Sequence, residues 1–119
     1  MAAYSFSQPI SEISVEELAQ RMAEFPGGLQ LIDVREPQEV AIAQIEGFEV
    51  LPLSEFAEWS DQIHHRFDLQ TETLVMCHHG MRSAQMCQWL VQQGFTNVKN
   101  VVGGIDAYSR MVDPTIPCY

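Results

Sequence analysis

The amino-acid sequence predicts an α/β domain in which a parallel β-sheet carries helices on both faces. Strand-like runs alternate with helical segments, and the spacers between the runs are long enough to hold a helix. The first run, residues 29–34, is mostly apolar, as expected for a strand that is buried on both faces. The chain has 119 residues, 46% of them apolar, and no repeat or linker, which predicts one domain over residues 1–119.

The first predicted helix begins at Ser14, because Ser14 and Glu17 form a capping box. Its apolar face, at helical spacing, consists of Val15, Leu18, Ala19 and Met22. The Pro-Gly-Gly turn at residues 26–28 ends this helix, and the strand over residues 29–34 comes next.

The middle of the chain continues the alternation with shorter elements. A short helix is expected over residues 36–43 and a strand over residues 49–53. Ser54 is expected to be the N-cap of a further helix over residues 55–67.

The second half of the chain predicts two more strand and helix pairs. A strand over residues 73–76 precedes a loop and a helix over residues 83–93, which Gly94 ends. A strand over residues 98–102 is followed by a short helix over residues 105–111.

The net charge of −10 is unevenly distributed along the chain. A charge of this sign disfavours nucleic acid and an anionic membrane surface as partners. Residues 1–76 hold three basic and fourteen acidic side chains, whereas residues 77–110 hold Arg82, Lys99 and Arg110 against Asp106. Either this second stretch is a cationic surface that attracts anions, or the charge of a short window simply fluctuates.

Cysteine usage and the N-terminal residues predict a cytoplasmic protein. The three cysteines, Cys77, Cys87 and Cys118, include no Cys-x-x-Cys pair, which favours neither a disulfide framework nor a zinc site. Residues 1–7 lack the basic and apolar regions of a signal peptide, and no apolar run reaches the length of a membrane span. A reducing compartment is the resulting expectation.

Residues 74–83 are the most informative stretch of the sequence. An apolar strand ends in Cys77, Arg82 closes a short loop, and a helix follows with Ser83 as its expected N-cap. This order places a thiol among backbone N–H groups, next to a helix N-terminus and a fixed positive charge, which together stabilise a thiolate and attract anions. We expect Cys77 to be the nucleophile in group transfer on a small anionic substrate; a merely buried thiol is the alternative.

The other loop residues are expected to bind this substrate: His78, His79, Gly80, Met81 and Arg82. Gly80 either lets the loop turn its N–H groups inward or is an ordinary turn glycine. Arg82 either orients an oxyanion or fixes the loop to a carboxylate such as Asp33. His78 and His79 are expected to supply partial positive charge near neutral pH.

No metal and no cofactor are expected. The candidate metal ligands are Cys77, His78, His79, His64 and His65. Consecutive ligands rarely converge on one ion without a second, spaced cluster, and the sequence shows no such cluster.

Four further residues are assigned roles outside the chemistry. Asp33 and Arg35 are expected to be structural, with Arg35 joined to carboxylates such as Glu36 or Glu39. Cys87 shares the apolar stripe of its predicted helix and is expected to be a core thiol, whereas Cys118 is expected to be exposed.

Three stretches in the correct order and spacing resemble the rhodanese (sulfurtransferase) family. Residues 31–37 read Leu-Ile-Asp-Val-Arg-Glu-Pro, which is similar to the family's first signature. Residues 77–83 match its active-site loop, Cys-x-x-Gly-x-Arg-Ser. Gly94-Phe95 with the Gly-Gly turn at residues 101–105 is similar to its closing signature.

This resemblance implies a rhodanese-like fold with a sheet of about five strands. It also implies that a Cys77 thiolate takes sulfur from an anionic donor such as thiosulfate, or from a persulfide donor such as a protein, and holds it as a persulfide. A thiophilic acceptor, either a small molecule or a protein, then removes this sulfur. Residues 112–119 are similar to the ending of rhodanese domains fused to adenylyltransferases, which pass sulfur to carrier proteins.

Two positions depart from the family pattern, and two other functions compete. Residues 43–48 lack the usual Gly-His-Ile, and Tyr108 stands where Trp is more frequent, a change expected to affect packing. A cysteine phosphatase or arsenate reductase has a similar loop, but with five residues between cysteine and arginine, whereas four separate Cys77 from Arg82. A non-catalytic binding or sensing module is the second competitor, although such modules usually lack the cysteine.

Overall fold

The computed structural model describes residues 9–119, whose strands form one five-stranded parallel sheet in the order β1-β5-β4-β2-β3. The strands are β1 (Glu12–Ile13), β2 (Gln30–Asp33), β3 (Glu49–Val50), β4 (Thr73–Met76) and β5 (Val98–Val101). The predicted α/β fold with a central parallel sheet is therefore confirmed. The expectation about a signal peptide concerns residues 1–7, which lie outside the described part of the chain.

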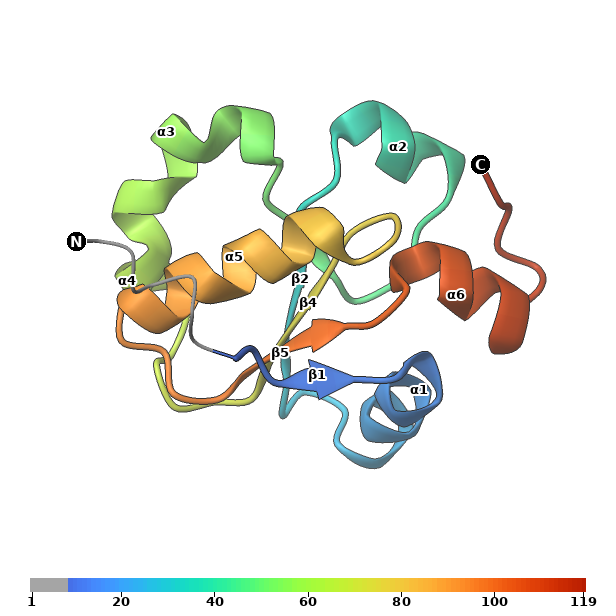
Figure 1. Ribbon diagram of the computed structural model, residues 1–119, viewed down its shortest axis with the longest axis horizontal. Helices are drawn as coiled ribbons and strands as arrows, with labels where there is room; N and C mark the ends of the chain where they lie inside the picture. Colours follow the sequence, from blue (N-terminus) through green and yellow to red (C-terminus); the bar gives the residue numbers. More distant parts are fainter. Residues whose placement is uncertain (1–8) are drawn as a thin grey trace.

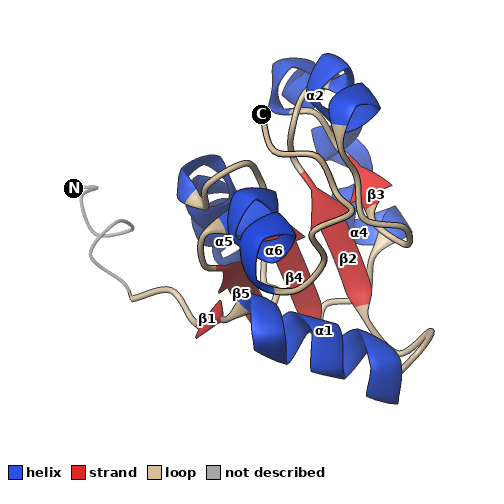
Figure 2. Cartoon of the chain, turned by 90° about the vertical axis from the view of Figure 1, so that its right-hand side faces the viewer, coloured by secondary structure: helices blue, strands red, loops and turns tan. Residues whose placement is uncertain are grey.

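Helices cover both faces of the sheet (Figures 1 and 2). They are α1 (Val15–Glu24), α2 (Pro37–Ile42), α3 (Phe56–Trp59), α4 (Ile63–Arg66), α5 (Met81–Gln92) and α6 (Gly104–Met111). Helices α1 and α6 lie together on one face, and α3, α4 and α5 lie on the other (Figure 1). Over residues 9–119, no helix combines the length and the apolar character needed to cross a lipid bilayer.

The residues of strand β4 are almost all apolar because helices cover both faces of the sheet at this strand. Leu74 and Met76 pack into the core beneath α1 and α6, whereas Val75 and Cys77 pack into the core beneath α3, α4 and α5. Alternate side chains of a strand point to opposite faces, so a strand covered on both faces must be apolar at every position.

The helix predicted over residues 55–67 is instead a broken series of short turns. The 3-10 helices η2 (Leu53–Glu55) and η3 (Ser60–Gln62) alternate with α3 and α4. Ser54 lies inside η2 and its hydroxyl donates to the Glu36 carboxylate, so its prediction as an N-cap is wrong. The Trp59 indole N–H donates to the Pro52 carbonyl at 2.8 Å, a bond within this segment that the sequence periodicity does not indicate.

Two strands also differ from the prediction. Strand β3 ends at Val50, three residues earlier than predicted, although the Leu51 and Leu53 N–H groups still donate to the carbonyls of Asp33 and Val34. Strand β1 was not predicted, since its two residues carry no apolar pattern. Backbone hydrogen bonds to Ser11 and Ile13 attach it to the edge of the sheet at β5.

The register of the central strands sets the position of the site. Asp33 is opposite Met76, and Val75 is opposite Asn100. The carboxyl ends of β2, β4 and β5 therefore lie side by side, which places Cys77 between the residues that end its two neighbours.

Candidate active site

Cys77 follows the last residue of β4, and the loop that it opens ends at Gly80, the N-cap of α5. The cysteine residue is only 1% exposed. Gly80 has a φ of +105°, a conformation that residues with a Cβ rarely adopt. This turn directs the Gly80 N–H back to the Cys77 sulfur, at 3.1 Å.

Two further donors from the first turn of α5 approach the same sulfur. The Ser83 backbone N–H lies 3.4 Å from Cys77 Sγ, and the Ser83 hydroxyl lies 3.3 Å from it. Donors fixed around a sulfur in this way stabilise negative charge on it, which is what a thiolate nucleophile requires. The loop thus contains the N–H groups that the sequence argument placed around Cys77.

The prediction that Ser83 is the N-cap of the helix is wrong. Helix α5 begins at Met81, two residues earlier than predicted, with Gly80 as its cap. Ser83 is fully buried, and its hydroxyl also contacts Asn100 Oδ1 at 2.5 Å. Because Asn100 Nδ2 donates to the Gly80 carbonyl at 3.0 Å, its Oδ1 faces Ser83 as an acceptor. The single hydroxyl proton of Ser83 can therefore be donated to Asn100 Oδ1 or to Cys77 Sγ, but not to both at once. Asn100 therefore joins both ends of the turn, although nothing in the sequence singled it out.

Replacing Ser83 by alanine should slow alkylation of Cys77 by iodoacetamide at neutral pH about tenfold, because a hydrogen bond to a charged group is lost. Mass spectrometry of samples quenched at successive times measures the rate of alkylation. The matched control is Thr73→Val, which removes another fully buried hydroxyl, at the start of β4. An equal slowing in both variants would mean that the Ser83 hydroxyl acts only through stability.

The N-terminus of α6 holds the loop from its other side. The Ile105 and Asp106 N–H groups donate to the carbonyls of Cys77 and His78, at 2.9 and 3.1 Å. These two bonds point the loop carbonyls away from the sulfur. They require Gly104 (φ +59°) to lie directly against the loop backbone, where a Cβ would come within 2.3 Å of the Cys77 oxygen.

Arg82 is paired with Glu39 of α2 in a two-pronged contact. Its Nη1 and Nη2 lie 2.7 and 2.9 Å from the two carboxylate oxygens. Hydrogen bonds from Arg82 lower the pKa of Glu39 to about 2, and the same pair raises the pKa of Arg82. Of the two predicted roles, this geometry favours fixing the loop to a carboxylate, but the partner is Glu39 and not Asp33.

Arg35 is fully buried and binds Asp33, at 2.7 Å between Nη2 and Oδ2. Burial opposes its charge, but hydrogen bonds with Asp33 and Tyr119 outweigh burial and raise the pKa of Arg35. The predicted attachment to the Glu36 or Glu39 carboxylates is wrong, since Arg35 reaches only the backbone carbonyl of Glu39, at 3.3 Å. The buried partner is preferred because an unpaired buried carboxylate would be costly.

The cationic stretch over residues 77–110 does not form an unpaired positive surface. Arg82, Lys99 and Arg110 each bind a carboxylate, those of Glu39, Glu72 and Asp106. The charge balance of this window therefore says little about anion binding, and the backbone N–H groups of the loop are the better candidates for that task.

His78 differs from the expectation that it carries partial positive charge near neutral pH. Burial, followed by repulsion from His79, lowers the pKa of His78 below 6.5, so that His78 is neutral at pH 7. Its Nε2 is buried without a hydrogen-bond partner. His79 is exposed, and its Nε2 lies 3.9 Å from the Asp106 carboxylate.

One group within residues 9–119 brings metal-binding atoms together. His78, His79 and Asp106 place one ligand atom each within 4.8 Å of one another, so Asp106 is the spaced third residue that the sequence did not reveal. Arg110 already binds the Asp106 carboxylate at 3.0 Å, and His78 is stacked between two other rings. These contacts compete with an ion, and the expectation of no metal stays a prediction.

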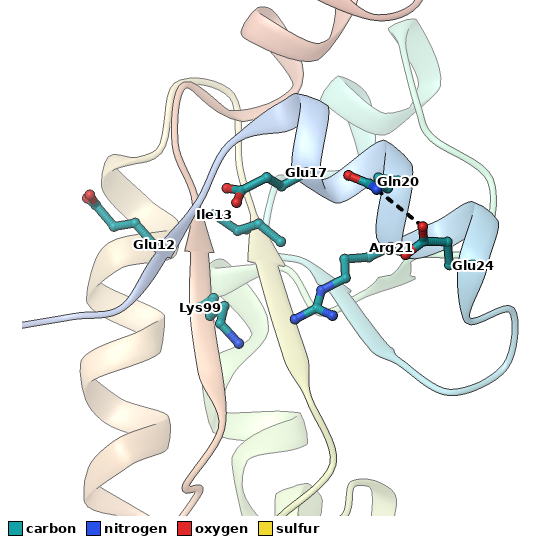
Figure 3. A pocket seen from close by; sticks show the side chains of 7 residues that line it. All are labelled: Glu12, Ile13, Glu17, Gln20, Arg21, Glu24 and Lys99. Carbon is teal, nitrogen blue, oxygen red and sulfur yellow. Dashed lines mark hydrogen bonds between the residues drawn. The ribbon is translucent and has the colours of Figure 1, made fainter.

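A pocket of about 120 Å³ opens beside the sulfur, lined by Cys77, His78, His79, Met81 and Arg82. The structure thus brings together the loop residues that the sequence assigned to substrate binding, apart from Gly80, which serves the turn. A pocket of about 260 Å³ lies elsewhere, between α1 and the edge of the sheet (Figure 3). Its cations, Arg21 and Lys99, both bind Glu72, so it is an ion-pair cluster of the fold.

The other two cysteines lie where the sequence predicted. Cys87 is fully buried in the core, where burial, followed by the charge of Cys77, raises its pKa to about 12. Cys118 is exposed, with its sulfur 3.2 Å from the Ser109 hydroxyl. Tyr108, at a position where the family more often has Trp, is a buried core residue.

Comparison with known proteins gives consistent results. The rhodanese-like domain family matches residues 14–111. A chloroplastic rhodanese-like/PpiC domain-containing protein 12 of Arabidopsis thaliana is 46% identical over 114 residues, which are 94% of this chain but only 38% of that protein. A sulfurtransferase of Allochromatium vinosum is 36% identical over 101 residues, 85% of this chain and 90% of that protein.

The solved structures agree with these sequence relatives. The human single-domain sulfurtransferase TSTD1 superimposes with a TM-score of 0.71 and 25% identity, over 87% of this chain and 98% of that protein. The sheet order, the loop from Cys77 to Ser83 and these similarities lead to one assignment. This chain belongs to the rhodanese-like domain family.

Proposed function

We propose that this protein transfers sulfane sulfur from an anionic donor such as thiosulfate to a thiophilic acceptor, through a persulfide on Cys77. The observation that carries the proposal is the pair of backbone N–H groups, from Gly80 and Ser83, that approach Cys77 Sγ. They stabilise a thiolate, which is the nucleophile of the first step of such a reaction and the leaving group of the second.

The reaction has two steps in which atoms and electrons balance. The Cys77 thiolate attacks the outer sulfur of thiosulfate, a new S–S bond forms, and the old S–S bond breaks with its electron pair leaving on sulfite. An acceptor such as cyanide or a thiolate then attacks the outer sulfur of the persulfide. Thiocyanate or a new persulfide leaves, and the Cys77 thiolate is regenerated.

The loop supports sulfur transfer over phosphoryl transfer. The pocket beside Cys77 is small, about 120 Å³. The Arg82 guanidinium is engaged by both oxygens of Glu39, so it is not directed at a tetrahedral oxyanion on the sulfur. The short loop, with four residues between Cys77 and Arg82, agrees with this preference.

Two assays on the same preparation test the proposal. With thiosulfate and cyanide, the protein should form thiocyanate with ping-pong kinetics, and with p-nitrophenyl phosphate it should release no nitrophenol. Phosphate turnover without thiocyanate would favour a phosphatase. If neither substrate turns over and thiosulfate leaves no sulfur on the protein, a binding module would become the better description.

A further inference from the structure

The segment after α6 returns to the active-site loop and ends beside α2 (Figures 1 and 2). It is attached to α6 through Ser109, whose hydroxyl donates to the Ile116 carbonyl. Ile116 is partly buried against the core beneath α1 and α6. This path brings the side chain of Tyr119 to the residues that surround Cys77.

The Tyr119 hydroxyl joins two ion pairs that are separate in sequence. It accepts a hydrogen bond from Arg35 Nη1 at 3.0 Å and donates one to Glu39 Oε2 at 3.1 Å. The same Glu39 oxygen receives Arg82 Nη2 at 2.9 Å. A continuous chain of polar contacts therefore runs from the buried Arg35 through Tyr119 and Glu39 to Arg82 of the loop motif.

The Tyr119 ring makes a second, independent contact with the loop. It stacks on the imidazole of His78, with ring centroids 3.9 Å apart and planes inclined by 4°. The His79 ring also contacts His78, at 3.9 Å between centroids, with the two planes inclined by 35°. Because the Nε2 of His78 has no hydrogen-bond partner, this side chain is restrained by its neighbouring rings and by a backbone contact with Tyr119.

The protonation states keep this arrangement intact over the usual assay range. Burial raises the pKa of Tyr119, so its phenol stays neutral and keeps its proton for Glu39. The pKa of Glu39 is about 2, so its carboxylate stays ionised and accepts from both Tyr119 and Arg82.

We propose that Tyr119 is a positioning residue for sulfur transfer: its hydroxyl fixes the Glu39–Arg82 pair and its ring fixes His78. This inference rests on the proposed function. Arg82 and His78 both line the pocket beside Cys77, so Tyr119 sets the shape of the space into which the donor anion must fit. Restraint of a binding loop before the ligand arrives lowers the cost of binding, which predicts an effect on the KM for the donor.

The test compares Tyr119→Leu, which removes the ring and the hydroxyl, with Tyr119→Phe, which removes the hydroxyl alone. We expect the KM for thiosulfate to rise about tenfold in Tyr119→Leu and about threefold in Tyr119→Phe, with kcat changed less. Tyr108→Phe is the matched control, since Tyr108 is a buried residue of α6 away from the loop, and its KM should not change. Circular dichroism establishes that each variant is folded.

A second readout does not depend on catalysis. In Tyr119→Ala, water reaches the face of His78 that Tyr119 covers, so the pKa of His78 should rise toward 6.5. NMR titration of the imidazole measures this pKa, and the neighbouring titrating groups are His79, Asp106 and Glu39. If the wild-type protein turns over thiosulfate, an unchanged KM in folded Tyr119→Leu would overturn the positioning role. If it forms no persulfide, the proposed function fails, and an unmoved His78 titration would then overturn the positioning role separately.

Discussion

Cys77→Ser should lose sulfur transfer by at least about a thousandfold, because the oxygen nucleophile that replaces the thiolate cannot form a persulfide. Incubation of the wild-type protein with thiosulfate, followed by intact-mass measurement, should show the gain of one sulfur atom. In Cys77→Ser this gain should be absent. The two backbone N–H groups that approach the sulfur give the physical reason for expecting the reaction at this residue.

The other two cysteines provide matched controls for this result. Cys87 is buried with a pKa of about 12, so it stays a thiol, and Cys87→Ala should keep the mass gain. Cys118 is exposed but has no ring of backbone donors among its described contacts, and Cys118→Ser should also keep the gain. A sulfur atom that persists in Cys77→Ser and disappears in Cys118→Ser would move the reactive centre to residue 118.

Gly104→Ala should lower the free energy of unfolding by about 4 kcal/mol, because the new Cβ would collide with the backbone of the active-site loop. The nearest atoms would be the carbonyl oxygens of Cys77 and His78, at 2.3 and 2.4 Å, and neither can move without breaking its bond to α6. Urea unfolding measures the change.

The variant Gly27→Ala measures the cost of a positive φ without a collision of the added Cβ. Gly27 also has a positive φ, +83°, but a Cβ there would meet no atom within 4 Å. It should therefore cost only the left-handed conformation, about 1–2 kcal/mol. Equal losses in the two variants would show that the loop gives way to the added methyl group, contrary to the geometry.

The sequence could predict those parts of the candidate site whose residues lie close together along the chain. The strand that ends in Cys77, the turn at Gly80 and the helix that follows all lie within one short segment, and their order could be predicted. Cys87 could be placed in the core because the apolar stripe of its helix is a local pattern.

Contacts between distant segments could not be predicted in this way. Glu39 pairs with Arg82 only because α2 packs beside the loop, and Asn100 reaches Ser83 only because β5 is the neighbour of β4. Neither residue has a sequence pattern of its own. Ser83 was misassigned for a related reason: a serine before a helical run is typical of an N-cap, but Gly80 takes that position when its positive φ closes the turn.

The bonds from Ile105 and Asp106 to the loop carbonyls have a consequence for how the protein is made. A chain grows from its N-terminus, so Cys77 and the loop leave the ribosome well before the helix that holds them. Until residues 104–106 follow, the loop carbonyls lack the donors that orient them in the finished protein. The active-site loop is thus complete only after α6 has followed it, later than the synthesis of the loop's own residues.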